Sequence, residues 1–205
     1  MKRRQSQRIQ LAREAAELLY SKQEKEHKQA KLRAAKTLGL SFLPTNAEIE
    51  AEIDQIAEER EGSARAQRLK LMRLEALKVM RALHVFNPVL AGSVWRGTAR
   101  YSSDVDIFSY ADSPQEVLDT LIENNFHVIR TEKHTSKKLG AQGGSSFHIF
   151  LESTSSNLVE VVVKKRASVK QPQRCSIYGD KIVGLSVHQL ETVLESNPNQ
   201  RFIPT

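Results

Sequence analysis

The sequence has 205 residues, of which 40% are hydrophobic and 27% are charged, an ordinary composition for a globular protein. Its apolar runs are too short to span a membrane, and the N-terminal Met-Lys-Arg-Arg lacks the apolar stretch of a secretory signal. A single cysteine, Cys175, excludes an intrachain disulfide and a cysteine-rich zinc site. We therefore expect a cytoplasmic protein with no membrane segment.

The formal net charge of +7 is unevenly distributed along the chain. Residues 1–38 hold 11 Lys/Arg against 4 Asp/Glu, whereas residues 39–205 hold 20 of each. A concentrated basic segment is typical of nucleic-acid binding, so RNA is a candidate partner of residues 1–38. A solvated, lysine-rich helix explains the same composition. A homodimer or a helical protein partner is also left open.

The first part of the chain has the composition of helices. Residues 3–38 contain no Pro or Gly and are rich in Ala, Leu, Glu and Lys, which predicts a helix that Gly39 ends. Thr45-x-x-Glu48 is a capping box that begins a second helix, and Gly62-Ser63 precedes a third. The buried positions of these last two helices are predicted by helical spacing to be Ile49, Ile53, Ile56, Leu69, Met72, Ala76, Met80 and Leu83.

Strand patterns begin after His84. The expected strands are 89–91, 105–110, 127–131 and two segments around "SFHIFLE" and "NLVEVVVKK", joined as a hairpin by the polar turn 153–157. Ser113-Pro114 and the capping box Ser186-x-x-Gln189 begin further helices. The sequence thus predicts an all-helical N-terminal segment, 1–84, followed by an α+β domain, 85–205, with a mixed sheet flanked by helices.

Two aspartates stand on the strand that begins near Val105. Because side chains alternate across a strand, Asp104 and Asp106 point to the same face, where their charges repel each other. A divalent cation resolves this, and Mg²⁺ is typically bound by one or two carboxylates together with substrate phosphates. Glu160, within the apolar run "LVEVVVK", is the candidate third acid, although alternation also allows it to face solvent. Glu152 is the competing candidate, less favoured because it lies at the end of its strand.

Gly92-Ser93 follows a strand and precedes a short helical turn expected over 94–98. Glycine allows a phosphate to approach the backbone closely, and a helix N-terminus offers free N–H donors. The Ser93 hydroxyl adds another donor. This turn therefore suits a polyphosphate, with the paired aspartates following soon after in the chain.

These residues together resemble a known active-site signature. Gly92-Ser93, then Arg96-Gly97-Thr98-Ala99-Arg100, then Ser103-Asp104-Val105-Asp106-Ile107 are similar to the motif of the DNA polymerase β-like nucleotidyltransferase superfamily, and of its minimal nucleotidyltransferase branch in particular. The third carboxylate of the family lies on a later strand between apolar residues. Val159-Glu160-Val161 matches that placement, with Glu where Asp is common. The first 84 residues are not part of the minimal core.

The resemblance implies a specific reaction. A nucleoside monophosphate is transferred from an NTP such as ATP to an acceptor hydroxyl, and pyrophosphate is released. Asp104, Asp106 and Glu160 are implied to be catalytic and to bind two Mg²⁺ ions. The implied nucleotide-binding residues are Gly92, Ser93, Arg96 and Arg100, although either arginine equally suits a solvated turn.

The alternative is a non-catalytic nucleotide-binding or antitoxin-like module that acts through a partner protein. The three intact carboxylates favour the enzyme. His148, on the strand before Glu160, is expected to be a structural or surface histidine. Lys164-Lys165-Arg166 follows Glu160 closely enough to contact an anionic acceptor, or is simply the charged end of a strand.

Overall fold

The computed structural model describes residues 2–135, 145–153, 158–170 and 173–204, and its contacts divide the chain into two compact units. One unit comprises Met1–Arg65 with Arg174–Asp180, and the other comprises Ala66–Gln173 with Lys181–Thr205. The boundary lies inside the helix α4 (Ser63–Ala82), so most of that helix belongs to the second unit. No helix among the described residues is long and apolar enough to cross a bilayer.

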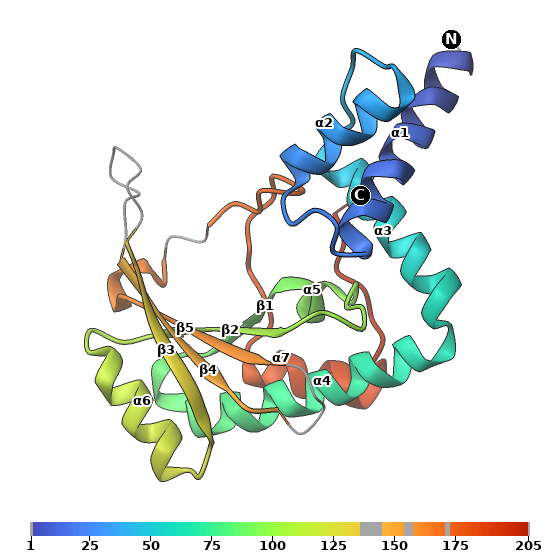
Figure 1. Cartoon of the computed structure of the whole chain (residues 1–205). Helices are drawn as coiled ribbons and strands as arrows, with labels where there is room; N and C mark the ends of the chain where they lie inside the picture. Colours follow the sequence, from blue (N-terminus) through green and yellow to red (C-terminus); the bar gives the residue numbers. More distant parts are fainter. Residues whose placement is uncertain (1, 136–144, 154–157, 171–172, 205) are drawn as a thin grey trace. The chain divides into compact units, whose positions relative to one another are not determined.

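The first unit is built from three helices, α1 (Lys2–Tyr20), α2 (His27–Leu38) and α3 (Asn46–Glu61), shown in blue to cyan in Figure 1. α1 contacts both α2 and α3. The faces in contact are rich in alanine and branched aliphatic side chains. The fully buried members are Leu11, Ala15, Ala16, Ala30, Ala34, Ile49, Ile56 and Ala57.

The single helix predicted over residues 3–38 is wrong. α1 ends at Tyr20 and α2 begins at His27, with Lys22 in the left-handed region at φ 59°. The Glu24 N–H donates to the Leu18 carbonyl at 3.0 Å, which stabilises the reversal. Two amphipathic helices that fold back can bury their apolar stripes on each other, whereas one straight helix would leave both stripes exposed.

The predicted N-terminus of α3 is confirmed. The Thr45 hydroxyl accepts from the Glu48 N–H, and the Glu48 carboxylate accepts from the Thr45 N–H at 2.6 Å. Glu48 also pairs with Arg8 of α1 at 2.5 Å. The hydrogen bond from Arg8 and those from Thr45 outweigh burial and lower the pKa of Glu48 to about 2.

The second unit contains a five-stranded mixed sheet, which confirms the α+β fold class. The strands, in spatial order, are β1 (Val89–Ala91), β2 (Val105–Tyr110), β5 (Val159–Lys164), β4 (Ser145–Leu151) and β3 (Val128–Thr135). β2 and β5 are parallel, and the other neighbours are antiparallel. The remaining elements are the helices α5 (Gly92–Arg96), α6 (Pro114–Glu123) and α7 (Val187–Ser196) and two 3₁₀ turns, His84–Phe86 and Arg166–Ser168.

The elements of this unit follow the expected order. The strand expected at 127–131 continues to Thr135, because it pairs along the whole length of β4. The β4–β5 hairpin is confirmed by its antiparallel register, while residues 154–157 of its expected turn lie outside the described residues. The capping box of α7 is present at Ser186 and Gln189.

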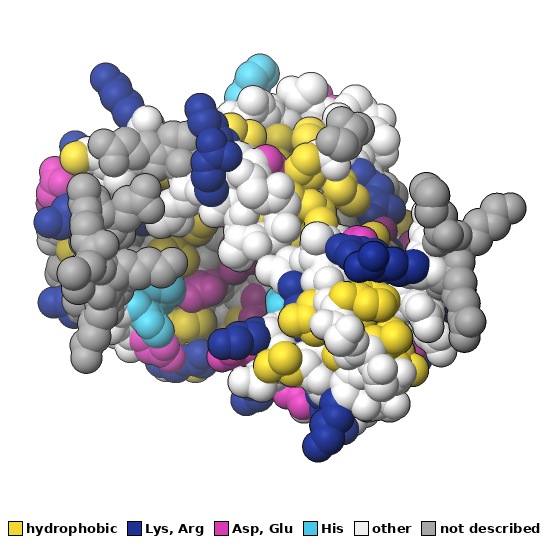
Figure 2. Space-filling model, turned by 90° about the horizontal axis from the view of Figure 1, so that it is seen from above, with side chains coloured by type: hydrophobic (Ala, Val, Ile, Leu, Met, Phe, Trp, Pro, Cys, Tyr) yellow, Lys and Arg dark blue, Asp and Glu magenta, His cyan; other side chains and the backbone are white. Residues whose placement is uncertain are grey.

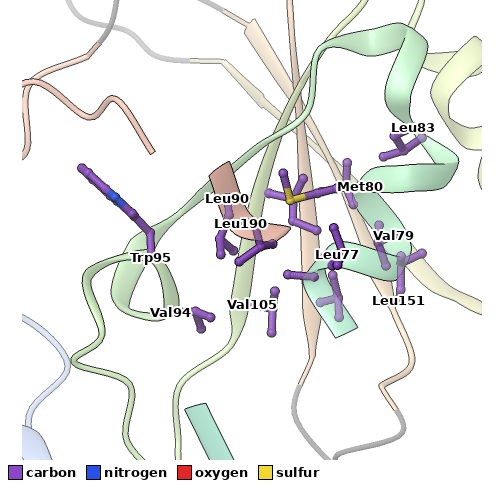
Figure 3. Close-up of a cluster of buried hydrophobic side chains, with 14 of the residues drawn as sticks. Leu77, Val79, Met80, Leu83, Leu90, Val94, Trp95, Val105, Leu151 and Leu190 are labelled. Carbon is purple, nitrogen blue, oxygen red and sulfur yellow. The ribbon is translucent and has the colours of Figure 1, made fainter. Parts of the chain in front are cut away.

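The hydrophobic core lies between one face of the sheet and the helices α4 and α7, which run along the same side of the sheet (Figure 1). Figure 3 shows side chains of α4, the sheet and α7 meeting in this layer, among them Met80, Leu90, Val105 and Leu190. α6 adds Val117 and Leu121 to the same cluster. Burial of these apolar surfaces is the main force that orders the sheet.

Alternation along β2 separates the two faces of the sheet. Val105, Ile107 and Ser109 are buried, whereas Asp106, Phe108 and Tyr110 are half-buried. Because the buried set belongs to the core, Asp106 and its alternate neighbours lie on the opposite face. The fold therefore places the strand carboxylates on the face that the core helices do not cover.

Ser109 is the exception among the core-facing residues of β2. It is fully buried, and its Oγ has no hydrogen-bond partner among the described residues. A buried, unsatisfied hydroxyl destabilises a fold, so we expect Ser109→Ala to raise the free energy of unfolding by about 1 kcal/mol. Urea denaturation measures this. Ser113→Ala, which removes a side chain that makes no cap hydrogen bond, serves as the control and should leave the stability unchanged. A destabilised Ser109→Ala variant contradicts the prediction.

Candidate active site

Asp106 and Glu160 are direct neighbours across the parallel strands β2 and β5. Their side chains are hydrogen-bonded to each other. Burial, the charge of Glu160, the charge of Asp104 and this hydrogen bond, in that order of size, raise the pKa of Asp106 to about 7. The two residues therefore form an acid pair that holds a proton near neutral pH when no cation is bound.

Asp104 lies one residue before β2 and is exposed. It is two residues from Asp106, so it stands at the end of the same face. Its charge contributes to the raised pKa of Asp106, which places the three carboxylates within electrostatic reach of one another. β2 and β5 thus bring Asp106 and Glu160 together, and Asp104 stands two residues before Asp106. Glu152, the competing candidate, is exposed at the end of a different strand and is paired with His127.

The backbone at Gly92 approaches the Asp106 carboxylate closely. β1 pairs Ala91 with Asp106, and the next residue, Gly92, has a left-handed φ of 65°. A Cβ at this position would lie 1.9 Å from Asp106 Oδ2, so any side chain would displace the carboxylate. Ser93 follows in the first turn of α5 and is half-buried. The Gly92-Ser93 turn therefore lies directly beside the acid pair.

The structure places the two predicted phosphate-binding arginines differently. Arg96 is only 5% exposed, and its guanidinium donates to the Phe202 carbonyl at 2.9 Å and stacks on the Trp95 ring. Arg100 is half-buried. Its backbone N–H donates to the Ser103 hydroxyl at 3.0 Å, and this hydrogen bond closes the turn before Asp104. Arg96 thus contacts the C-terminal segment, and the backbone of Arg100 is part of the turn before Asp104.

Arg73 is a residue that the sequence analysis did not select. It is fully buried in α4, and its guanidinium donates to four backbone carbonyls, those of Val94, Trp95, Pro198 and Gln200, at 2.7–3.1 Å. Burial lowers its pKa to about 10. Arg73 therefore ties the short helix α5, which begins with the Gly92-Ser93 turn, to the C-terminal segment. Its sequence signal is a charged residue within the apolar stripe of α4.

His148 was expected to be structural or exposed, but it contacts the acid pair. Its Nδ1 lies 2.5 Å from Glu160 Oε1, and its Nε2 lies 2.8 Å from the Ser146 hydroxyl. The ring also packs against His134, with ring centroids 4.4 Å apart. The sequence contained a signal for this contact. β4 and β5 were predicted to form a hairpin, and alternation places the side chains of His148 and Glu160 on the same face of these adjacent strands.

The donor set fits a hard divalent cation. Asp104, Asp106 and Glu160 offer only carboxylate oxygens, the ligands that Mg²⁺ prefers, and positive charge among them would remove the repulsion that raises the pKa of Asp106. Among the described residues, no three acidic, histidine or cysteine side chains already converge as a preformed metal cluster. The chemistry of these three carboxylates therefore fits magnesium.

Comparisons with known proteins find no matching family model and no matching curated protein. Solved structures that resemble the chain include a GLD-2/RNP-8 complex (16% identity, TM-score 0.34), a cytoplasmic RNA terminal U-transferase (20%, 0.28) and the Cid1 poly(U) polymerase (18%, 0.30). Each match covers 60% of this chain and 36–39% of the solved chain, so this chain spans about two fifths of their length.

TM-scores this low support no inference about substrate or partner. The assignment of a function therefore rests on the residues and distances of the chain itself.

Proposed function

We propose that the second unit is a magnesium-dependent nucleotidyltransferase that moves a nucleoside monophosphate from an NTP to an acceptor hydroxyl and releases pyrophosphate. The observation that carries the proposal is the acid pair Asp106–Glu160, with Asp104 at the same face and the Gly92 backbone against it. In this proposal the Gly92-Ser93 turn binds the phosphates, and the neighbouring carboxylates bind the cation.

Each residue has a defined role in this proposal. Asp104, Asp106 and Glu160 would hold two Mg²⁺ ions, which supply charge stabilisation to the triphosphate and lower the pKa of the acceptor hydroxyl. The Gly92-Ser93 turn binds the β- and γ-phosphates through its backbone N–H groups and the Ser93 hydroxyl. The protein contributes positioning and electrostatic stabilisation, as expected for phosphoryl transfer.

The acceptor that we propose is RNA, bound in part by α2. Over residues 1–65 the 13 Lys/Arg are nearly balanced by 11 Asp/Glu, because α3 is acidic. Two arginines of α1 form ion pairs with acids of α3, Arg8 with Glu48 and Arg13 with Glu59. α2 contains no acidic residue, and its exposed lysines include Lys28 and Lys36. On the face drawn in Figure 2, Lys and Arg side chains stand singly rather than in one continuous patch. The ion pairs of α1 and the lack of acidic residues in α2 favour a local contact at α2 over a basic surface spread along residues 1–38.

A transfer assay tests the proposal. The purified protein is incubated with Mg²⁺, each α-³²P-labelled NTP and either total RNA or a cell lysate, next to the Asp104→Ala/Asp106→Ala variant. We expect label in RNA with the wild type and a loss of at least about 10³-fold in the variant, because the cation ligands are removed. Label in protein instead of RNA would identify a different acceptor class. Equal labelling by both proteins would overturn the proposal.

The second candidate is a non-catalytic nucleotide-binding or antitoxin-like module that acts through a partner protein. One observation favours it: burial and the neighbouring charges of Glu160 and Asp104 raise the pKa of Asp106 to about 7, so without a cation this carboxyl group is partly protonated at neutral pH. Binding of Mg-ATP without transfer to RNA or protein would favour this candidate over the enzyme.

A further inference from the structure

His148 lies diagonally across from Glu160 on the face of the sheet that carries the carboxylates. The register of β4 and β5 pairs Phe150 with Glu160 and His148 with Val162, so all four side chains share one face. Diagonal neighbours across antiparallel strands are within reach of long or aromatic side chains. The distance of 2.5 Å between His148 Nδ1 and Glu160 Oε1 shows that this contact is a hydrogen bond.

Both nitrogens of the His148 ring have partners, and these partners define its proton position. A carboxylate only accepts hydrogen bonds, so Nδ1–H donates to Glu160. Nε2 lies 2.8 Å from the Ser146 hydroxyl, which can donate or accept a hydrogen bond. The His134 ring packs on the same imidazole at a centroid distance of 4.4 Å. The contacts with Glu160, Ser146 and His134 therefore fix the orientation of the His148 ring.

We infer that His148 is a positioning residue that holds the Glu160 carboxylate beside Asp106, in the orientation needed to bind the cation. This inference rests on the proposed function, because it assigns Glu160 as a cation ligand. In this role His148 acts through its contact with Glu160. Its hydrogen bond restricts rotation of the Glu160 side chain, as a hydrogen-bond partner of a metal ligand generally does.

The chain contains a matched pair for comparison. His127 Nδ1 lies 2.6 Å from Glu152 Oε2, so this pair has the same two groups as His148 and Glu160 at nearly the same distance. Those side chains are 73% and 66% exposed, whereas His148 and Glu160 are 18% and 23% exposed. Removal of His127 therefore controls for the loss of a His–Glu pair away from the carboxylate site.

The experiment compares His148→Phe, His148→Asn and the control His127→Phe with the wild type. Phe keeps a planar ring without a donor, and Asn keeps an N–H donor near the position of Nδ1. Mn²⁺ affinity, measured by electron paramagnetic resonance without nucleotide, and the kcat and KM for NTP are determined for each. Thermal unfolding confirms that every variant is folded.

We expect His148→Phe to weaken Mn²⁺ binding and to lower kcat by about 10- to 100-fold each, the range for partners of metal ligands, with KM for NTP unchanged. His148→Asn should recover most of both losses, and His127→Phe should match the wild type. In the metal-free wild type, ¹⁵N NMR should show the proton of His148 on Nδ1.

The outcomes separate this inference from the proposed function. Wild-type transfer with an unaffected His148→Phe variant overturns the positioning role and leaves the function standing. Weakened Mn²⁺ binding in His148→Phe, in a chain that transfers no nucleotide, supports the positioning role and overturns the enzyme. An Nδ1 that carries no proton, or a failure of Asn to recover Mn²⁺ binding, also overturns the inference.

Discussion

Asp106→Asn is expected to stabilise the metal-free protein at pH 8 by about 2–4 kcal/mol, while it abolishes nucleotide transfer. The pKa of Asp106 is raised from 3.8 to about 7, mainly by burial and by the charges of Glu160 and Asp104. Each unit of pKa shift corresponds to about 1.4 kcal/mol of differential stability. Asn has nearly the same size and fits beside Gly92, and its amide can still donate to Glu160.

The sign of the pH dependence follows from linkage. The folded protein binds the Asp106 proton more tightly than the unfolded chain, so the stabilising contribution is fully present below about pH 4. It is lost as the pH rises through about 7. The stability difference between Asp106→Asn and the wild type should therefore be close to zero at pH 4 and should grow up to pH 8.

Urea denaturation in EDTA at pH 4, 6 and 8 measures this difference. Asp112→Asn, which neutralises an exposed carboxylate, is the control and should show no such dependence on pH. Saturating Mg²⁺ should stabilise the wild type but not Asp106→Asn. The stability advantage of Asp106→Asn at pH 8 should therefore become smaller or reverse when Mg²⁺ is added. An advantage of Asp106→Asn that is equal at pH 4 and pH 8 would contradict the raised pKa.

Arg73→Met is expected to destabilise the fold by about 3–5 kcal/mol, the largest loss that we predict for a single substitution. The substitution removes the donors to four backbone carbonyls, of which the hydrogen bonds to Val94 and Trp95 are buried and those to Pro198 and Gln200 are part-buried. Met fills much of the volume, so the loss measures hydrogen bonding rather than a cavity. Arg73→Lys should recover only part of it, because an ammonium cannot reproduce the planar geometry of the guanidinium.

Arg81→Met is the matched control for Arg73. Arg81 lies on the same helix, α4, but its side chain is 62% exposed and pairs with Glu191 at 2.7 Å. Exposed ion pairs contribute little, so its loss should cost less than about 1 kcal/mol. Hydrogen exchange should also show faster exchange in α5 for Arg73→Met only. Equal stability of the two variants would show that the Arg73 hydrogen bonds are not needed.

The local features of this protein could be predicted from the sequence because each depends on residues close together in the chain. The capping boxes at Thr45 and Ser186 satisfy backbone N–H groups within one turn, so their sequence pattern was sufficient. Alternation within β2 placed Asp104 and Asp106 on one face, and the hairpin brought β4 next to β5. The motif order from Gly92 to Asp106 likewise indicated the candidate site.

Other features depend on contacts between distant residues, which no local pattern contains. The break between α1 and α2 occurs without Pro or Gly, because packing of two apolar stripes outweighs the helix propensity of residues 21–26. Arg73 could be recognised only as a charge in an apolar stripe, since its four carbonyl partners come from other segments. The contact of His148 with Glu160 required the β4–β5 register, and a shift of one residue would place the two side chains on opposite faces.

The sequence by itself therefore determined the α+β class, the caps and the order of the candidate site residues. Only the tertiary structure decided which side chains meet at that site. Asp106 and Glu160 are neighbours because β2 and β5 pair in one parallel register, and Gly92 lies against them because β1 ends beside Asp106. The raised pKa of Asp106 follows from burial and charges that exist only once these strands are assembled.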